Sequence, residues 1–228
     1  PSGAAEIRQA GYEFDKMRKR IVRHLNQRSE MLSGISHDLR TPLTRMKLQI
    51  AFIKDKELAN KLSEDINEME KMLNEYLHFS STEANDKTET FNFSELMEEI
   101  ILKYENSNIS LSSKPRIYFD GRKNLITRCI NNLLDNSLKY ANKIEINLEK
   151  ENTNLLISIS DDGPGVPQNE YKNIIKPFYK IDKSRSETKS SVGLGLAISS
   201  DIIKSHGGDI KFDKSNLGGL EVKISFPV

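Results

Sequence analysis

The chain of 228 residues is poor in several features that would assign a class of protein by themselves. Its single cysteine, Cys129, excludes an internal disulfide and a cysteine-based zinc site, and it indicates a reducing compartment. No apolar run approaches the ~20 residues that span a bilayer, and no signal peptide is visible. With 34 Lys and Arg against 33 Asp and Glu, the net charge is +1. We expect no nucleic-acid partner, because such a surface would need clustered basic residues.

The composition that remains is typical of a soluble, helix-rich protein, with 36% hydrophobic and 29% charged residues. The length suffices for one large domain, or for a small domain and a medium one. The chain begins with Pro1 rather than Met, so we expect it to be a piece of a longer protein. A membrane anchor before Pro1 therefore stays open.

The first eighty residues repeat apolar side chains at steps of three or four, close to the heptad pattern of a coiled coil. The charged break "KDKE" at residues 54–57 separates two such runs, which predicts two long helices joined by a short turn. An antiparallel hairpin covers only half of its apolar seam, so we expect two copies to form a dimeric four-helix bundle. From the pattern alone, a plain structural coiled coil is an equal alternative. The two runs comprise Ile7, Ala10, Phe14, Met17, Ile21, Leu25, Leu32, Ile35, Leu39, Leu43, Met46, Ile50 and Ile53, and then Leu58, Leu62, Ile66, Met69, Leu73 and Tyr76 or Leu77.

The segment "SSTEANDKTET", residues 80–90, interrupts this periodicity and is predicted to be a linker. After it, strand-like and helix-like segments follow in mixed order, which favours an α+β domain of about 140 residues. Asn92 or Ser94 is expected to cap the first helix, which contains Ile101. The other predicted elements are a strand at 116–120, a helix at 123–141, a hairpin of 143–150 and 154–160, a helix at 195–206 that ends at Gly207, and a hairpin of 208–214 and 219–226.

The predicted helix at 123–141 carries a polar stripe opposite its apolar side. At about 100° per residue, Asn132 and Asn136 point the same way, together with Arg128 and Lys139. A neutral amide oxygen beside a lysine suits a hydrated Mg²⁺ and phosphate oxygens, because Mg²⁺ takes few protein ligands and keeps several waters. A solvated helix face explains this stripe equally simply, and for the stripe alone it is the preferred interpretation.

The segment "DDGPGVP", residues 161–167, directly follows a predicted strand. Gly163 and Gly165 allow a tight turn and a close approach of the backbone to a ligand. Asp161, at the end of the strand, could accept a hydrogen bond from an exocyclic amine. The alternative is an ordinary Asp-Gly-Pro surface turn.

A second glycine motif, "SVGLGLAI" at residues 191–198, precedes an apolar helix. Backbone N–H groups at Gly193 and Gly195 and the positive end of the helix could face phosphates. The motif is not a Walker A loop, because no Gly-Lys-Ser/Thr follows, and alone it is weak. Residues 176–190, "KPFYKIDKSRSETKS", are polar, basic and aperiodic, which fits a lid whose Lys180, Lys183 and Arg185 reach phosphates.

The segment "SHDLRTPL" lies inside the first long helix and joins reactive residue types to a proline. His37 lies about 200° around the helix from Ile35, so it faces away from the apolar seam. Thr41 lies one turn further along the same face. Asp38 is placed to accept the proton of one ring nitrogen and to leave the other free to attack. Pro42 blocks a backbone hydrogen bond to residue 38, so we expect a kink at these residues.

Taken together, "SHDLRTPL", "NNLLDNSLKYA", "DDGPGVP", "KPFYK" and "GLGLAI" resemble, in order, the H, N, G1, F and G2 boxes of bacterial sensor histidine kinases. The resemblance covers nearly the whole chain, and "GISHDLRTPLTR" after "EIRQAGYEFDKM" is especially similar to the EnvZ-like members. It implies the end of a HAMP signal-relay helix at 1–29, a dimerisation and histidine-phosphotransfer hairpin at 30–82, and an ATP-binding α/β sandwich of the gyrase–Hsp90–kinase type at 83–228.

The resemblance also implies roles for single residues. His37 would be the phosphoacceptor, Asp38 its general base, and Thr41 the residue that orients water for dephosphorylation of the partner. Asn136, supported by Asn132, would bind Mg²⁺. The remaining nucleotide-binding positions would be Lys139 on phosphate, Tyr140 near adenine, Asp161 on the adenine amino group, Gly163, Gly165, Gly193, Leu194, Gly195 and Leu196 in the loops, and Phe178, Lys180 and Arg185 in the lid.

This reading predicts an enzyme that uses ATP and Mg²⁺ to phosphorylate His37 and passes phosphate to an aspartate of an OmpR-like response regulator. It implies a homodimer and the cytoplasmic part of a membrane-anchored parent. Ser191, Asp135 and Ser137 depart from the usual family residues, and none of them removes a ligand. An ATPase or serine kinase of the same superfamily would lack "SHDLRTP", and a coiled-coil scaffold would need neither His37 nor Asp161.

Overall fold

The computed structural model describes residues 5–81, 87–104, 107–113, 116–181 and 193–228. The chain divides into two compact units, Pro1–Asn85 and Asp86–Val228, and each unit is described by itself. The division falls within the predicted linker at residues 80–90. The boundaries at residues 29/30 and 82/83 stay predictions.

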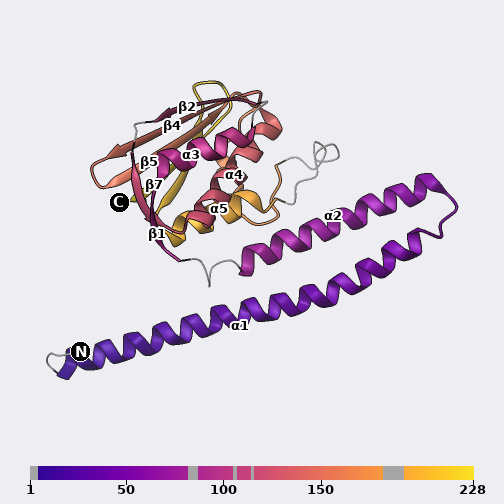
Figure 1. Ribbon diagram of the computed structural model, residues 1–228, viewed down its shortest axis with the longest axis horizontal. Coiled ribbons are helices and arrows are strands. Elements are labelled where there is room, and N and C mark those ends of the chain that lie inside the picture. Colours follow the sequence, from indigo (N-terminus) through magenta and orange to yellow (C-terminus); the bar gives the residue numbers. More distant parts are fainter. Residues whose placement is uncertain (1–4, 82–86, 105–106, 114–115, 182–192) are drawn as a thin grey trace. The chain divides into compact units, whose positions relative to one another are not determined.

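The N-terminal unit is a hairpin of two helices, α1 (Ala5–Ile50) and α2 (Lys56–Ser81) (Figure 1). Asp55 ends the turn between them, because its Oδ1 accepts hydrogen bonds from the backbone N–H groups of Glu57 and Leu58. The heptad seam brings Leu43 of α1 and Ile66 of α2 into the apolar contact, where both are buried. The predicted helical hairpin is therefore confirmed.

Helix α1 continues through Pro42 without interruption. The hydroxyl of Thr44 donates to the carbonyl of Arg40 at 2.9 Å, so a side chain bonds the backbone within the turn that contains the proline. The kink expected at Pro42 stays a prediction. Among the described helices, none is both long enough and apolar enough to cross a membrane.

One hairpin leaves much of its apolar surface in water. Leu39 and Met46, both on the predicted seam, are each 46% exposed in the single chain, whereas Leu43 between them is 8% exposed. Further exposed apolar residues of the two helices are Ile7, Phe14, Met17, Ile21, Ile35, Leu58 and Met69. Exposed apolar side chains that recur along the predicted seam favour the expected dimer.

The C-terminal unit is built on a five-stranded sheet with the strand order β2-β4-β5-β7-β6. Only β2 and β4 are parallel, and the other neighbours are antiparallel. A small second sheet pairs β1 with β3. The strands are β1 (Glu89–Asn92), β2 (Asn108–Ser113), β3 (Tyr118–Gly121), β4 (Lys143–Glu151), β5 (Asn154–Asp161), β6 (Asp209–Lys214) and β7 (Leu220–Pro227).

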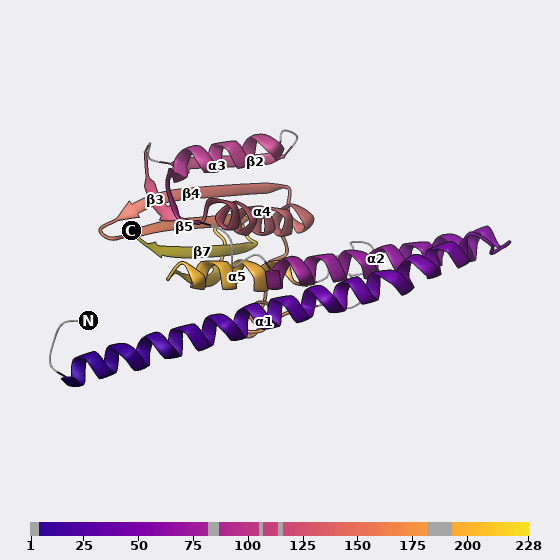
Figure 2. The ribbon, with the colours of Figure 1, turned by 60° about the horizontal axis from the view of Figure 1, so that its bottom comes forward.

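Three helices cover one face of the large sheet, namely α3 (Phe93–Ile101), α4 (Lys123–Tyr140) and α5 (Gly195–Ser205). Helices α4 and α5 lie side by side (Figures 1 and 2). Two 3-10 turns, Leu102–Tyr104 and Gln168–Glu170, complete the described elements. A helical region followed by an α/β sheet domain confirms the predicted fold class.

The core of this unit is built from side chains that alternate between buried and more exposed positions along the strands. Ile144, Ile146 and Leu148 of β4 are buried beneath the helices, while the intervening side chains face the other side. Strands β5 and β7 repeat this pattern. Phe93, Phe119 and Phe226 form an aromatic cluster with ring centroids 5.1–6.5 Å apart. This core fixes the ends of β5 and β7, where the candidate site lies.

The structure also corrects the predicted elements. Strand β1 occupies the end of the segment predicted to be linker, and strand β2 was not predicted. Both are short, polar and paired with distant segments, so local composition does not reveal them. Of the two capping candidates, Asn92 is the residue that caps α3, because its side chain accepts a hydrogen bond from the backbone N–H of Ser94 at 3.1 Å.

Candidate functional site

Asp161 ends strand β5 and is 6% exposed. Its Oδ1 accepts two backbone N–H groups, from Gly163 and from Leu220, each at 3.0 Å. Its Oδ2 accepts the hydroxyl of Ser137, which is buried on α4, at 3.3 Å. Three segments far apart in the chain therefore hold one carboxylate. After these bonds, Oδ2 keeps one lone pair for another donor.

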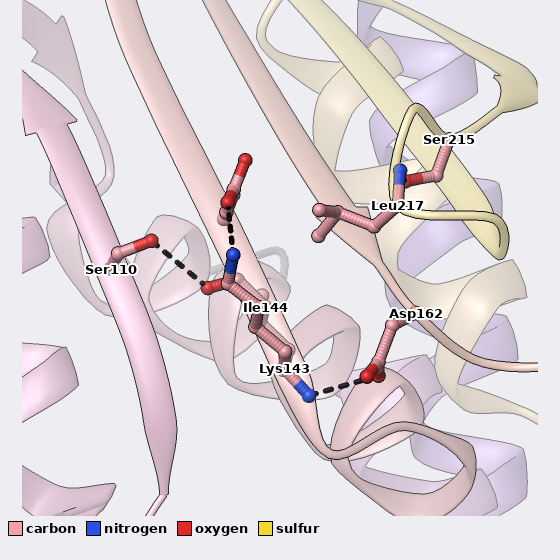
Figure 3. A network of polar contacts seen from close by, with 7 residues as sticks. Ser110, Lys143, Ile144, Asp162, Ser215 and Leu217 are labelled. Atoms are coloured by element: carbon pink, nitrogen blue, oxygen red, sulfur yellow. Dashed lines mark hydrogen bonds and ion pairs between the residues drawn. The ribbon is translucent and has the colours of Figure 1, made fainter.

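The next residue, Asp162, ties the end of β5 to the start of β4. Its Oδ1 accepts the backbone N–H groups of Asn142 at 2.8 Å and Lys143 at 2.9 Å, and Figure 3 shows the bond to Lys143. These backbone donors hold the pKa of the Asp162 carboxyl below its usual value. A Cβ on Gly163 would lie 3.2 Å from the carbonyl oxygen of Tyr140, so this turn lies close against the end of α4.

The polar stripe predicted on α4 lies partly buried. Asn132, Asn136 and Lys139 are each of intermediate exposure. The amide nitrogen of Asn132 is buried without a protein partner, and the Cβ of Asn132 is the nearest atom to a Cβ built on Gly195 at the start of α5. The ammonium of Lys139 lies 5.4 Å from the ring centroid of Tyr140, which is 50% exposed. The buried amide of Asn132 has a donor to offer to a ligand.

These residues suit a nucleotide with Mg²⁺. The described residues contain no cluster of three His, Cys, Asp or Glu that would cage a metal by itself. An amide oxygen at Asn136 is instead the kind of single ligand that leaves Mg²⁺ its waters and phosphate oxygens.

The second glycine motif lies against the segment "KPFYK". Gly193 has φ +77°, and a Cβ there would lie 3.1 Å from the carbonyl oxygen of Tyr179. Phe178, itself at φ +64°, donates its N–H to the carbonyl of Gly193 at 2.9 Å. Leu194 is buried, while Gly195 and Leu196 in the first turn of α5 are half-buried.

The other predicted residues of these loops have different placements. Lys180 is half-buried, and Gly165 has φ +70°. Arg185, Lys183 and Ser191 lie outside the described residues.

The predicted phosphoacceptor is a residue of α1 in the other unit. Position 37 is helical, and the side chain of His37 lies outside the described part of the chain. Asp38 and Thr41 are exposed on the same helix. A hollow of about 370 Å³ on α1 is lined by Arg40, Thr41, Thr44, Arg45 and Leu48.

Several residues of the site were not predicted to act in it. Leu220 and Gly219 were assigned only to a hairpin, although the glycine pair at 218–219 was a visible signal for a close backbone approach. Glu170 was also missed, and its Oε2 accepts the hydroxyl of Tyr179, within the segment "KPFYK", and the side-chain amide of Asn173. Cys129 is buried in the core, and this burial raises the pKa of its thiol to about 12.

Two family models match the chain. Residues 27–85 match the His Kinase A (phospho-acceptor) domain. Residues 121–228 match the histidine kinase-, DNA gyrase B-, and HSP90-like ATPase domain. The two matches place the predicted phosphoacceptor in one domain and Asp161 in the other.

Curated relatives match along the whole chain. Sensor histidine kinase GtrS of Pseudomonas aeruginosa is 32% identical over 227 residues, which are 99% of this chain and 47% of that protein. Sensor histidine kinase CpxA of Escherichia coli is 30% identical over 242 residues, which cover 100% of this chain and 53% of CpxA. The chain thus spans about half the length of these relatives.

Solved structures share the fold. Full-length ShkA in complex with AMPPNP has a TM-score of 0.66 at 19% identity, over 87% of this chain and 45% of ShkA. The catalytic domain of the histidine kinase ThkA has a TM-score of 0.54 at 24% identity, over 62% of this chain and 95% of that domain. The α/β unit therefore has the architecture of a catalytic domain found in these proteins.

Proposed function

Because the chain belongs to the family of sensor histidine kinases, we propose that it transfers the γ-phosphoryl group of ATP to His37. The observation that carries this proposal is the environment of Asp161. A buried carboxylate with both lone pairs of Oδ1 occupied, and one of Oδ2 left over, accepts one N–H donor, as the 6-amino group of adenine supplies.

The phosphates and Mg²⁺ would lie between α4 and the start of α5. The amide oxygen of Asn136 would hold Mg²⁺, which supplies charge neutralisation at the phosphates when it is bound. The ammonium of Lys139 would contact phosphate, and Tyr140 would lie against the base. Lys180 and Arg185 would add positive charge, and Gly193 and Gly195 would let backbone N–H groups approach the phosphates at the helix end.

The chemical step follows the general logic of phosphoryl transfer, which depends on positioning and on neutralised charge. One imidazole nitrogen of His37 would attack the γ-phosphorus, a P–N bond would form, and the bond to the β-phosphate oxygen would break to release ADP. Asp38 would accept the proton from the other ring nitrogen and so keep the attacking nitrogen nucleophilic.

Phosphate would next pass from His37 to an aspartate of a response regulator, for which an OmpR-like receiver is the proposed partner. The hollow beside Thr41 is lined by Arg40 and Arg45, whose guanidinium groups would contact that partner's phosphorylated site. Thr41 would orient the water that removes phosphate from the regulator. The EnvZ-like subtype, the homodimer and the membrane-anchored parent belong to this proposal as well.

The two alternatives predict different chemistry. An ATPase or serine kinase of the same superfamily would hydrolyse ATP or phosphorylate a hydroxyl, and a coiled-coil scaffold would bind no nucleotide. Incubation with γ-labelled ATP and Mg²⁺ identifies the proposed kinase, because phosphohistidine is labile in acid and stable in alkali, whereas a phosphorylated hydroxyl is stable in acid. The release of labelled inorganic phosphate without labelled protein would identify an ATPase and distinguish it from a scaffold. Label with the opposite stability, or no label at all, would contradict the proposal.

A further inference from the structure

The β6–β7 hairpin contacts Asp161 more closely than a side chain would allow. Gly219 donates its N–H to the backbone carbonyl of Asp161 at 3.1 Å, and Leu220 donates to Oδ1 at 3.0 Å. A Cβ built on Gly219 would lie 2.1 Å from Oδ1 of Asp161 and 2.5 Å from the nitrogen of Gly163. Real side chains do not approach so closely, so only glycine fits here while Asp161 stays in place.

The hairpin turn holds Gly219 at this position by its own hydrogen bonds. Ser215 is buried, and its Oγ accepts the N–H of Leu217 at 3.0 Å, residues that Figure 3 shows in the turn. The N–H of Ser215 donates to the carbonyl of Gly219 at 3.0 Å, and Gly218 donates to the carbonyl of Ser215 at 3.0 Å. The first residues of β7 are thereby fixed beside the end of β5.

Ser137 holds the second oxygen of the same carboxylate. Because two backbone donors occupy Oδ1 and the hydroxyl of Ser137 occupies one lone pair of Oδ2, rotation of the carboxylate would break at least one of these bonds. The remaining lone pair of Oδ2 is therefore held in one fixed direction.

We propose that Gly219, Leu220 and Ser137 are positioning residues that aim Asp161 at one donor and thereby set the selectivity of the site for a base with an exocyclic amine. This inference rests on the proposed function, because the ligand is the adenine nucleotide. It goes further in assigning base selectivity to a hairpin and to a helix hydroxyl that act through Asp161.

The test compares two nucleotides that differ in one group. ADP carries the 6-amino group, and the diphosphate of purine riboside lacks it. Titration calorimetry of the 228-residue chain with each, in the presence of Mg²⁺, gives the ratio of the two dissociation constants. The variants are Gly219→Ala and Ser137→Ala. Gly218→Ala is the matched control, because it strains the same turn at φ +109° while its Cβ meets nothing within 4 Å.

We expect Ser137→Ala to reduce the preference for ADP about fivefold, as the loss of one hydrogen bond implies, and Gly219→Ala to reduce it at least tenfold. Affinity for the purine riboside diphosphate should stay within about twofold of the original, and Gly218→Ala should keep the full preference.

An unchanged ratio in Ser137→Ala and Gly219→Ala, or an equal loss for both nucleotides, would overturn the inference while the original chain still binds ADP. If Gly219→Ala loses its circular dichroism spectrum, Ser137→Ala alone decides. An original chain that binds neither nucleotide would instead overturn the proposed function, and this inference with it.

Discussion

The imidazole of His206 accepts a hydrogen bond from the backbone N–H of Arg122, with Nε2 3.1 Å from the nitrogen. Its Nδ1 lies 2.8 Å from the carbonyl oxygen of Ile202, so Nδ1 carries the proton and Nε2 is the acceptor. The neutral ring thus joins the end of α5 to the start of α4, the two helices that carry the candidate nucleotide site.

Burial and the nearby Arg122 guanidinium lower the pKa of His206 below its ordinary value of 6.5. Well above pH 6.5 both the folded and the unfolded ring are neutral, so this group adds no pH dependence there. Below pH 6.5 the unfolded chain takes up a proton that the folded chain refuses, so the free energy of unfolding falls as the pH falls towards the folded pKa. Urea unfolding of the chain at a series of pH values should show this loss.

The variant His206→Gln removes the titrating group and keeps an amide that can accept a hydrogen bond. Its unfolding free energy should vary less with pH just below 6.5 than that of the original chain. If the free energy of unfolding changes with pH to the same extent in both proteins, protonation of His206 does not affect the stability of the fold. His24, exposed on α1, is the matched control, and His24→Gln should leave the slope of the C-terminal unit unchanged.

The exposed seam of the hairpin tests the proposed dimer. Replacing Leu39 and Met46 with Glu places charges where a second copy would bury apolar surface. We therefore expect the dissociation constant of the dimer to rise at least tenfold. Sedimentation velocity measures this change. Arg45→Glu, a neighbouring exposed position, is the control. An original chain that sediments as a monomer at micromolar concentration would contradict the dimer.

Asn136→Ala tests the metal and phosphate side of the site. Loss of the amide oxygen should weaken Mg²⁺-dependent ADP binding by at least tenfold, because Mg²⁺ has few protein ligands to replace it. Asn124→Ala, an exposed asparagine in the first turn of the same helix, should bind normally. If calorimetry shows that Asn136→Ala binds ADP with Mg²⁺ as tightly as the original chain, Asn136 is not a ligand of the metal.

The sequence predicted the parts of this molecule that depend on local pattern. The long helices follow from heptads, and the strands β4, β5 and β7 follow from alternation around an apolar core. Asp161 was predicted because a strand ends there and a glycine turn follows. Each of these signals lies within a few neighbouring residues.

What was missed depends on pairing between distant segments. Strand β1 gains its place from β3, and β2 from β4, so neither shows in its own composition. The glycine pair at 218–219 signals a close backbone approach, but only the folded structure shows that Gly219 approaches Asp161, 58 positions earlier in the chain. The hydrogen bond from Ser137 to Asp161 also could not be predicted from the sequence. In the sequence, position 137 is only a small residue on the apolar face of a helix.

Thr41→Ala separates the two directions of phosphate flow. The variant should keep its ability to phosphorylate His37, because Thr41 takes no part in that step, and it should dephosphorylate the response regulator at least tenfold more slowly. Thr44→Ala, three residues further along α1 and in the same hollow, is the control. Release of phosphate from a purified phosphorylated receiver domain gives the rate, and an unchanged rate would refute the proposed role.

Every proposed step depends on the transfer of phosphate from ATP to His37. The most direct measurement is to incubate the original chain, His37→Gln and His24→Gln with γ-labelled ATP and Mg²⁺, and to follow the alkali-stable label on each protein. We expect label on the original chain and on His24→Gln, and none on His37→Gln. Alkali-stable, acid-labile label on His37→Gln at the original level would contradict this proposal.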